Sequence, residues 1–409
     1  MDEHFFRHES GRLVVRLTRF FGTHHLALIE DVVQDTLVKA WEVWRFRGLP
    51  ENPSTWLFRV ARNKALDVLR RKKREQPLSW EHLEAFETEE HEREVLAHPL
   101  LADDVLRMMF VCCHPSLPQE SQIALMLKYL CGFSVQEIAR AFLTTEANIE
   151  KRLYRARQTF RKQHIPFEVP TQGALPARFS QVLLAIYLLF NEGYKSNQLH
   201  EVIRQELMEE ALRLGVLLTE QPQTRQPEAF ALLALMCFQA ARTHARLTET
   251  GALCLLPDQN RCLWNGALIE IGKTYLNKAA TGTHLSRYHL EAGISWEHTR
   301  AATYQATNWG KILQYYDALE TIAPSPIASL NRLIALAEVE GPRVALAAFD
   351  HLPHRDALST HHLYFSIRAY LLSAAGEREK ALLAWEQALE KAPSEAERLL
   401  IQHKINALI

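Results

Sequence analysis

The sequence has little of what β-sandwiches and membrane spans require. It contains 15 glycines and 17 prolines in 409 residues, below the roughly 12% that these two residues usually occupy together, which leaves few turns for a many-stranded fold. No uninterrupted apolar run approaches the roughly 18 residues of a transmembrane helix. We therefore expect an all-α protein with no membrane contact.

Signals for export, metal binding and catalysis are also missing. The segment Met1–His4 lacks the basic and apolar parts of a secretory signal, which predicts a cytoplasmic protein whose six cysteines stay reduced. Neither Cys112–His114 nor the histidines of 351–362 have zinc-site spacing, so we expect no metal and no other cofactor. A phosphate-binding glycine loop, a nucleophile elbow and a zincin histidine pair are absent from the sequence, so we expect no catalytic residue and no enzyme.

The net charge of −1 conceals a strong separation of sign along the chain. Residues 59–74 include eight basic residues and one acidic residue, whereas residues 76–105 include nine acidic residues and one Lys or Arg, Arg93. Residues 144–164 return to six basic residues against two acidic ones. Two basic helical segments separated by an acidic, solvated linker predict two modules that grip one polyanion.

The first of two N-terminal amphipathic helices spans about 29–44. Its apolar residues recur every three or four positions and form a stripe that we expect in the core: Ile29, Val32, Val33, Leu37, Ala40, Trp41 and Trp44. The opposite face is polar and mostly acidic. It is either ordinary solvated surface or a docking face for a basic partner, and it comprises Asp31, Gln34, Asp35, Val38 and Glu42.

The second helix has a clear start, because Asn52 can cap it and Pro53 then occupies its first position. We expect Leu57, Val60, Ala61, Ala65 and Val68 to be buried. The other face combines cations for phosphates with amide and carboxylate groups for base edges, namely Arg59, Arg62, Asn63, Asp67, Arg70 and Arg71. A salt-bridged surface helix is the alternative, but most of these cations lack a local anion.

A helix-turn-helix is predicted after the linker. Gln122–Cys131 forms an apolar helix that ends at Gly132, and Ser134–Glu137 is a capping box that starts the next helix. After a turn, Thr145 can cap a helix whose inward residues are Ile149, Leu153, Ala156 and Phe160. Its outward face suits a major groove and carries Asn148, Lys151, Arg152 and Arg155. A plain helical hairpin is the alternative.

Three motifs occur in a characteristic order and spacing: Asp31–Trp41, Thr55–Arg71, and Phe133–Ala139 followed by Arg152–Arg157. Together they resemble an extracytoplasmic-function sigma factor of bacterial RNA polymerase over about the first 165 residues. The resemblance implies that one helix face docks on the clamp helices of the largest polymerase subunit through Asp31, Gln34, Asp35 and Val38.

The resemblance also implies where the promoter binds. The second helix would meet the minus-ten element through Arg59, Arg62, Asn63, Asp67, Arg70 and Arg71. The last helix of the helix-turn-helix would read the minus-thirty-five element through Asn148, Lys151, Arg152 and Arg155. Such a protein has no bond-making chemistry of its own. It captures a base extruded from the minus-ten duplex, and this contact offsets the free-energy cost of unstacking that base. Glu150 departs from the lysine that the family often has there, so the promoter sequence cannot be transferred.

The expected domains are sigma domain two at 1–75, an acidic linker at 76–105, sigma domain four at 106–165 and a helical extension at 171–409. In the extension, later positions of a tetratricopeptide repeat are matched by Gly376, Ala381, Trp385, Ala388 and Pro393. The triplet Ala381, Trp385, Ala388 aligns with Ala345, Phe349, Leu352 at a spacing of 36 and then with Ile312, Tyr316, Leu319 at a spacing of 33. These spacings predict a degenerate helical solenoid.

The rest of the extension, Leu183–Leu247 in particular, is helical but does not align with that repeat. Tyr187–Tyr194, Asp258–Trp264 and Trp309 resemble the sigma-factor group that carries such an extension. We expect the RNA polymerase core enzyme and promoter DNA as partners, and an unknown protein or ligand at the extension that replaces a separate anti-sigma factor. Two other readings stay open: an autonomous helix-turn-helix regulator with a solenoid sensor, and a repeat scaffold that holds RNA or a membrane surface.

Overall fold

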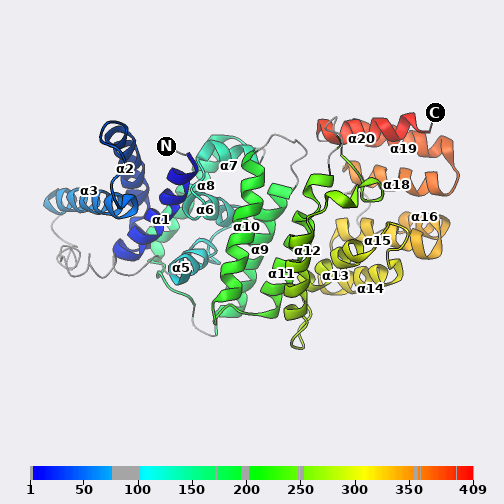
Figure 1. Cartoon of the computed structure of the whole chain (residues 1–409), viewed down its shortest axis with the longest axis horizontal. Helices are drawn as coiled ribbons and strands as arrows, with labels where there is room; N and C mark the ends of the chain where they lie inside the picture. Colours follow the sequence, from blue (N-terminus) through cyan, green and yellow to red (C-terminus); the bar gives the residue numbers. More distant parts are fainter. Residues whose placement is uncertain are drawn as a thin grey trace. The chain divides into compact units, whose positions relative to one another are not determined.

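The computed structural model describes residues 3–75, 102–142, 144–170, 173–194, 202–246, 248, 253–352, 358–359, 361–392 and 394–408. These residues form helices and no strand, which confirms the all-α prediction (Figure 1). None of the described helices is both long and apolar enough to span a membrane. The acidic linker up to residue 101 lies outside the described residues, as does Pro393. The chain divides into two compact units, unit 1 at Met1–Glu192 and unit 2 at Gly193–Ile409.

Unit 1 begins with three mutually packed helices, α1 (Glu3–Phe21), α2 (Leu26–Arg47) and α3 (Pro53–Glu75). The predicted cap is confirmed, because Asn52 Oδ1 accepts a hydrogen bond from the backbone N–H of Thr55 at 3.1 Å. The predicted stripe of α2 is buried except at its edge, where Leu37 is half-buried and Trp41 is 50% exposed. Trp41 instead lies beside Phe6, with ring centroids 6.0 Å apart.

The remaining helices of unit 1 are α5 (Ala102–Cys112), α6 (Gln119–Tyr129), α7 (Val135–Ala141), α8 (Glu146–Gln163) and α9 (Leu175–Tyr194), the last two residues of which belong to unit 2. Helix α6 begins three residues before the predicted start and ends two before the predicted end. The capping box is confirmed, since Glu137 Oε2 accepts from the Ser134 N–H at 2.7 Å and Ser134 Oγ accepts from the Glu137 N–H at 3.1 Å. Thr145 caps α8, whose four predicted inward residues are all buried.

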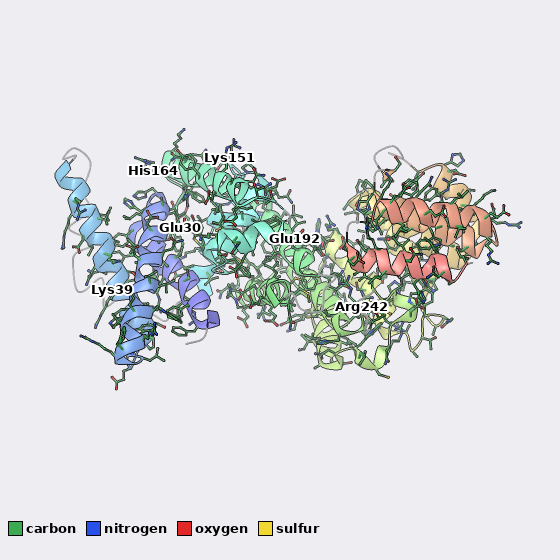
Figure 2. The ribbon with its side chains drawn as sticks, turned by 90° about the horizontal axis from the view of Figure 1, so that it is seen from above. Glu30, Lys39, Lys151, His164, Glu192 and Arg242 are labelled. Carbon is green, nitrogen blue, oxygen red and sulfur yellow. The ribbon has the colours of Figure 1, made fainter. Side chains whose placement is uncertain are left out.

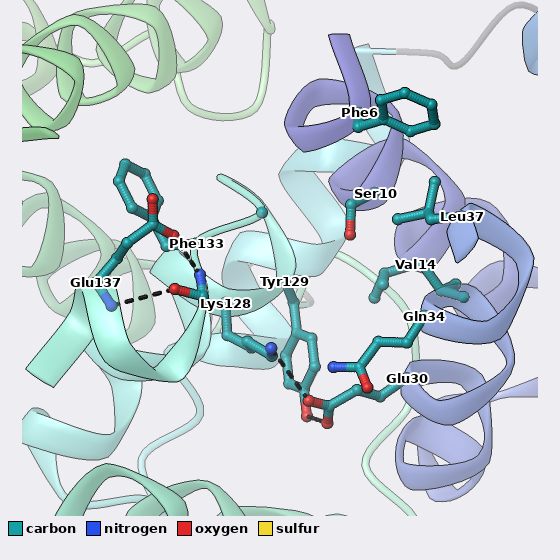
Figure 3. A pocket seen from close by; sticks show the side chains of 13 residues that line it. Phe6, Ser10, Val14, Glu30, Gln34, Leu37, Lys128, Tyr129, Phe133 and Glu137 are labelled. Carbon is teal, nitrogen blue, oxygen red and sulfur yellow. Dashed lines mark hydrogen bonds and ion pairs between the residues drawn. The ribbon is translucent and has the colours of Figure 1, made fainter. Parts of the chain in front are cut away.

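Glu30 on α2 joins the first three helices to α6 and α8. Its side chain, only 12% exposed, accepts hydrogen bonds from Arg157 at 2.5 Å and from the Tyr129 hydroxyl at 3.1 Å. It also lies 3.4 Å from Lys128 Nζ, and Figure 3 draws the contacts of Glu30 with Tyr129 and Lys128. Nearby, the backbone of α1 passes so close to α6 that a Cβ on Gly11 would lie 2.6 Å from the carbonyl oxygen of Leu130. Parts of the chain about a hundred residues apart are therefore fixed to each other by charge and by backbone contact.

Unit 2 is built from consecutive helices. They are α10 (Val202–Glu220), α11 (Pro227–Ala240), α12 (Gly266–Ala279), α13 (Arg287–Arg300), α14 (Trp309–Ile322), α15 (Pro326–Glu340), α16 (Pro342–Asp350), α18 (His362–Ala374), α19 (Arg378–Glu390) and α20 (Glu395–Asn406). From α13 onward, each helix packs on the next. The aligned triplets fall on α14, α16 and α19, except that Leu352 lies just after the end of α16. Each triplet contributes at least two residues to an apolar cluster. The aligned residues are therefore buried or half-buried in their own part of unit 2.

His298, on α13, is half-buried beside two positively charged side chains. Burial, together with the positive charges of Arg242 and Arg261, lowers its pKa from 6.5 to about 3. Its ring packs at the edge of Trp309, with centroids 5.2 Å apart.

We expect Glu30→Gln to destabilise unit 1 by about 2 to 4 kcal/mol, because Arg157 and Lys128 lose their common counter-charge while half-buried. Chemical denaturation followed by circular dichroism would measure the loss. The matched control is Glu42→Gln on the exposed face of the same helix, for which we expect no more than about 0.5 kcal/mol. Equal losses in the two variants would contradict the role of Glu30.

We expect acid to destabilise unit 2 through His298. The unfolded histidine binds a proton below about pH 6.5, whereas the folded one resists protonation down to about pH 3, so stability is lost as the pH falls through this window. Between pH 7 and pH 5 the loss is about 2 kcal/mol. Denaturation at both pH values should show it as a difference between wild type and His298→Gln, which cannot be protonated. A difference that does not change with pH would refute the assignment.

Candidate nucleic-acid and polymerase interface

The polar face of α2 is exposed as predicted. Asp31, Gln34, Asp35 and Val38 are all on the surface, and the side chain of Val38 is 61% exposed. Asp35 pairs with Lys64 of α3, with 3.1 Å between carboxylate and ammonium. The face thus presents acidic and amide groups with one exposed aliphatic residue, which suits a basic partner surface.

A pocket of about 270 Å³ adjoins this face within unit 1 (Figure 3). Gln34 and Leu37 of α2 line one side, and Phe133 and Glu137 at the start of the helix-turn-helix line the other. Glu30, Lys128 and Tyr129 also line it. The expected polymerase-binding face and the first helix of the helix-turn-helix therefore share one cavity.

The outward face of α3 is basic. The side chains of Arg59, Asn63, Asp67, Arg70 and Arg71 are all exposed, and Arg70 lies 3.3 Å from Asp67 on the preceding turn. The exposed guanidinium groups of this helix can reach phosphate oxygens.

Arg62 does not belong to that face, and its predicted surface position is wrong. Its side chain is 5% exposed, and the guanidinium carbon lies 5.4 Å from the ring centroid of Phe20 on α1. The helical period explains the error, since residue 62 shares a face with the buried residues Phe58, Leu66 and Leu69. The buried stripe is accordingly shifted from the predicted one, and Val60 and Val68 are only half-buried.

Phe46 is a surface residue that the sequence reasoning missed. It is 85% exposed near the end of α2, and Leu49 in the connection to α3 is 61% exposed. An exposed phenyl ring beside a basic helix is a platform on which an unstacked base can lie. The signal in the sequence is that Phe46 falls outside the apolar stripe of its helix.

The outward face of α8 carries the four predicted residues in different settings. Asn148, Lys151 and Arg155 are exposed, and Lys151 points away from the helix bundle in Figure 2. Arg152 is half-buried and pairs with Glu120 at the start of α6, with 2.7 Å between nitrogen and oxygen. Its guanidinium is therefore positioned by a neighbouring helix. The Asn148 amide donates a hydrogen bond to Thr144 Oγ1 at 3.1 Å, and Lys151 and Arg155 are exposed toward solvent.

Metal ligands do not assemble in the described part of the chain. No group of three or more His, Cys, Asp or Glu side chains there could hold a metal ion. Cys112 and Cys113 are buried, and burial raises the pKa of the Cys113 thiol to about 12. These thiols are packed in the interior at the C-terminal end of α5.

Comparison with known families divides the chain into three matched segments. Residues 6–75 match sigma-70 region 2, residues 107–160 match sigma-70 region 4, and residues 178–280 match a family of unknown function, DUF6596. The first two segments contain α1–α3 and the helix-turn-helix. No solved structure matches the chain.

Individual relatives agree with this division. An uncharacterized protein of Rhizobium meliloti is 37% identical over 396 residues, which covers 96% of this chain and 92% of that protein. An ECF RNA polymerase sigma-E factor of Haemophilus influenzae is 30% identical over 35% of this chain and 76% of its own length. The Escherichia coli (strain K12) protein of the same name is 31% identical over 32% of this chain and 70% of its own length. The chain is therefore a member of the extracytoplasmic-function sigma-factor family of bacterial RNA polymerase, with a long helical extension after the second sigma region.

Proposed function

We propose that this sigma factor binds the polymerase core through the exposed face of α2 that comprises Asp31, Gln34, Asp35 and Val38. The support is the acidic and amide character of that face together with its place in the segment that matches sigma-70 region 2. The ion pair of Asp35 with Lys64 is further support, because it is a contact between this face and a cation.

The minus-ten element binds along α3 in this proposal. Arg59, Arg70 and Arg71 contact phosphates, and Asn63 and Asp67 face base edges. Arg62 has no direct DNA contact here, because its side chain is packed against Phe20. Phe46 supplies the stacking surface for a base that leaves the duplex.

The minus-thirty-five element binds α8 in its major groove. The observation that carries this assignment is that Asn148, Lys151 and Arg155 are exposed together on the second helix of a capped helix-turn-helix, while the opposite face of α8 is fully buried. Arg152 forms an ion pair with Glu120 and thereby orients this helix. Its guanidinium contacts a phosphate at the edge of the groove.

The extension is proposed to regulate the sigma regions, and α13–α19 are proposed to be degenerate tetratricopeptide hairpins. Support comes from the three inward triplets at near-repeat spacing. A sensor of this kind binds a protein or a small ligand and takes the place of a separate anti-sigma factor.

We expect Lys151→Glu combined with Arg155→Glu to reduce promoter-dependent transcription at least about tenfold, because two cations at the groove become anions. The slope of the logarithm of DNA affinity against the logarithm of salt concentration should become less steep by about one for each phosphate contact that is lost. Run-off transcription with purified core enzyme, on a promoter selected from a random library by the wild-type holoenzyme, would measure the loss of activity. DNA binding by the same holoenzyme over a range of salt concentrations would measure the slope. Arg161→Glu, exposed on the same helix, is the control, and an equal loss there would contradict the assigned face.

We expect removal of the extension to change promoter-dependent transcription in cell extract. The truncation should follow Glu192 rather than residue 165, because Arg178 of α9 donates to the carbonyl oxygen of Phe110 at 2.5 Å and packs on its ring. Core binding by the shortened chain, assayed in parallel, separates a folding defect from lost regulation. Identical transcription by full-length and shortened proteins, with and without extract, would refute the regulatory role.

A further inference from the structure

Three arginines gather in unit 2 around motifs that promoter recognition does not use. Arg246 lies over the ring of Tyr194, with 3.8 Å between the guanidinium carbon and the ring centroid, and Arg242 donates to the Tyr194 hydroxyl at 3.4 Å. Arg242 and Arg261 both lie near the ring of Trp264, at 5.9 Å and 4.5 Å from its centroid. We call Arg242, Arg246 and Arg261 the arginine cluster; Arg242 is labelled in Figure 2.

The arginine cluster has no counter-charge among the described residues. Its members make no ion pair there, and Arg261 donates only to neutral carbonyl oxygens, those of His298 at 2.8 Å and Ala301 at 2.7 Å. Two acidic residues lie close in sequence to residues that contact the arginine cluster, but each forms an ion pair with a lysine instead. Glu297 pairs with Lys311 at 3.2 Å, and Asp258 pairs with Lys404 at 3.4 Å.

Donors without acceptors accompany these charges. Four of the buried N–H atoms that lack a hydrogen-bond partner within the described part of the chain lie in the cluster or in the tryptophans next to it: Arg242 Nε, Arg261 Nη2, Trp264 Nε1 and Trp309 Nε1. Trp264 itself is only 9% exposed. A buried donor without an acceptor typically costs about 1 to 3 kcal/mol, and half-buried guanidinium groups that repel one another add to that cost.

His298 connects Trp309 to the cluster and reports the local field. Its ring contacts Trp309, and burial together with the charges of Arg242 and Arg261 holds its pKa far below the ordinary value. The histidine therefore adds no positive charge at neutral pH, and the excess charge is that of the arginines.

We propose that the arginine cluster binds an oxyanion, the phosphate or carboxylate group of a small molecule. Planar guanidinium groups match such groups in a bidentate manner, and the free indole and guanidinium N–H groups supply further donors. The site lies mainly in the segment that matches the family of unknown function. It gives the proposed regulatory role a ligand class, although binding at this site does not require that role.

Thermal unfolding and tryptophan fluorescence of the full-length protein test the proposal, with sodium phosphate and sodium succinate titrated against sodium chloride at constant ionic strength. At least one oxyanion should raise the unfolding midpoint in a saturable manner. Arg242→Gln should weaken the apparent affinity roughly 10- to 100-fold, whereas Arg225→Gln, exposed elsewhere in unit 2, should leave it unchanged.

The two titrations distinguish the sources of the anion. A response to phosphate alone identifies a phosphorylated ligand, and a response to succinate alone identifies a carboxylate. If neither salt differs from chloride, or if Arg225→Gln weakens binding as much as Arg242→Gln, the proposal is wrong. The wild-type titration decides the matter even if Arg242→Gln fails to fold, and it needs no polymerase, so its outcome is independent of the proposed transcriptional role.

Discussion

The arrangement of unit 1 depends on the carboxylate of Glu30. This group is mostly removed from water and is satisfied by three partners that come from α6 and α8. Removing a carboxylate from water is costly unless charge and hydrogen bonds compensate for it, so α2 holds those helices in place. The close approach of Gly11 to Leu130 leaves the backbones no room to slide. Any motion that separates α2 from α6 must offer Glu30 either water or a new cation.

Features governed by short-range chemistry could be predicted from the sequence. The caps at Asn52, Ser134 and Thr145 and the buried face of α8 follow from residues three or four positions apart. The position of Arg62 could not be predicted in this way, because a long aliphatic stem with a stacked guanidinium can be buried against an aromatic ring. Periodicity identifies a helix, but the neighbouring helix decides which residues at the edge of a stripe are covered. Trp41 is the opposite case, because the period predicts that it is buried and the structure leaves it 50% exposed.

Contacts between distant segments had no signal in the sequence. Nothing in the pattern around Glu30 indicates Lys128, Tyr129 or Arg157 as partners, because these residues follow the helical period of their own elements. The arginine cluster is a similar case, since Tyr194, Arg242 and Trp264 belong to different elements of unit 2. The aligned triplets at 312–319, 345–352 and 381–388, by contrast, are buried or half-buried, as their apolar character predicts.

Arginine has two physically different settings in this protein, and they imply different ligands. On α3 and α8, exposed guanidinium groups such as Arg71 and Arg155 stay hydrated and can each accept a phosphate at little cost, which suits a long polymer read in register. In unit 2, guanidinium groups are partly desolvated over aromatic rings and are held by carbonyl oxygens. Guanidinium groups held in this way cannot follow a mobile DNA backbone. Much of the conformational entropy that they would lose on binding has already been lost in folding. The exposed arginines therefore suit DNA, whereas the fixed ones suit a small anion of defined geometry.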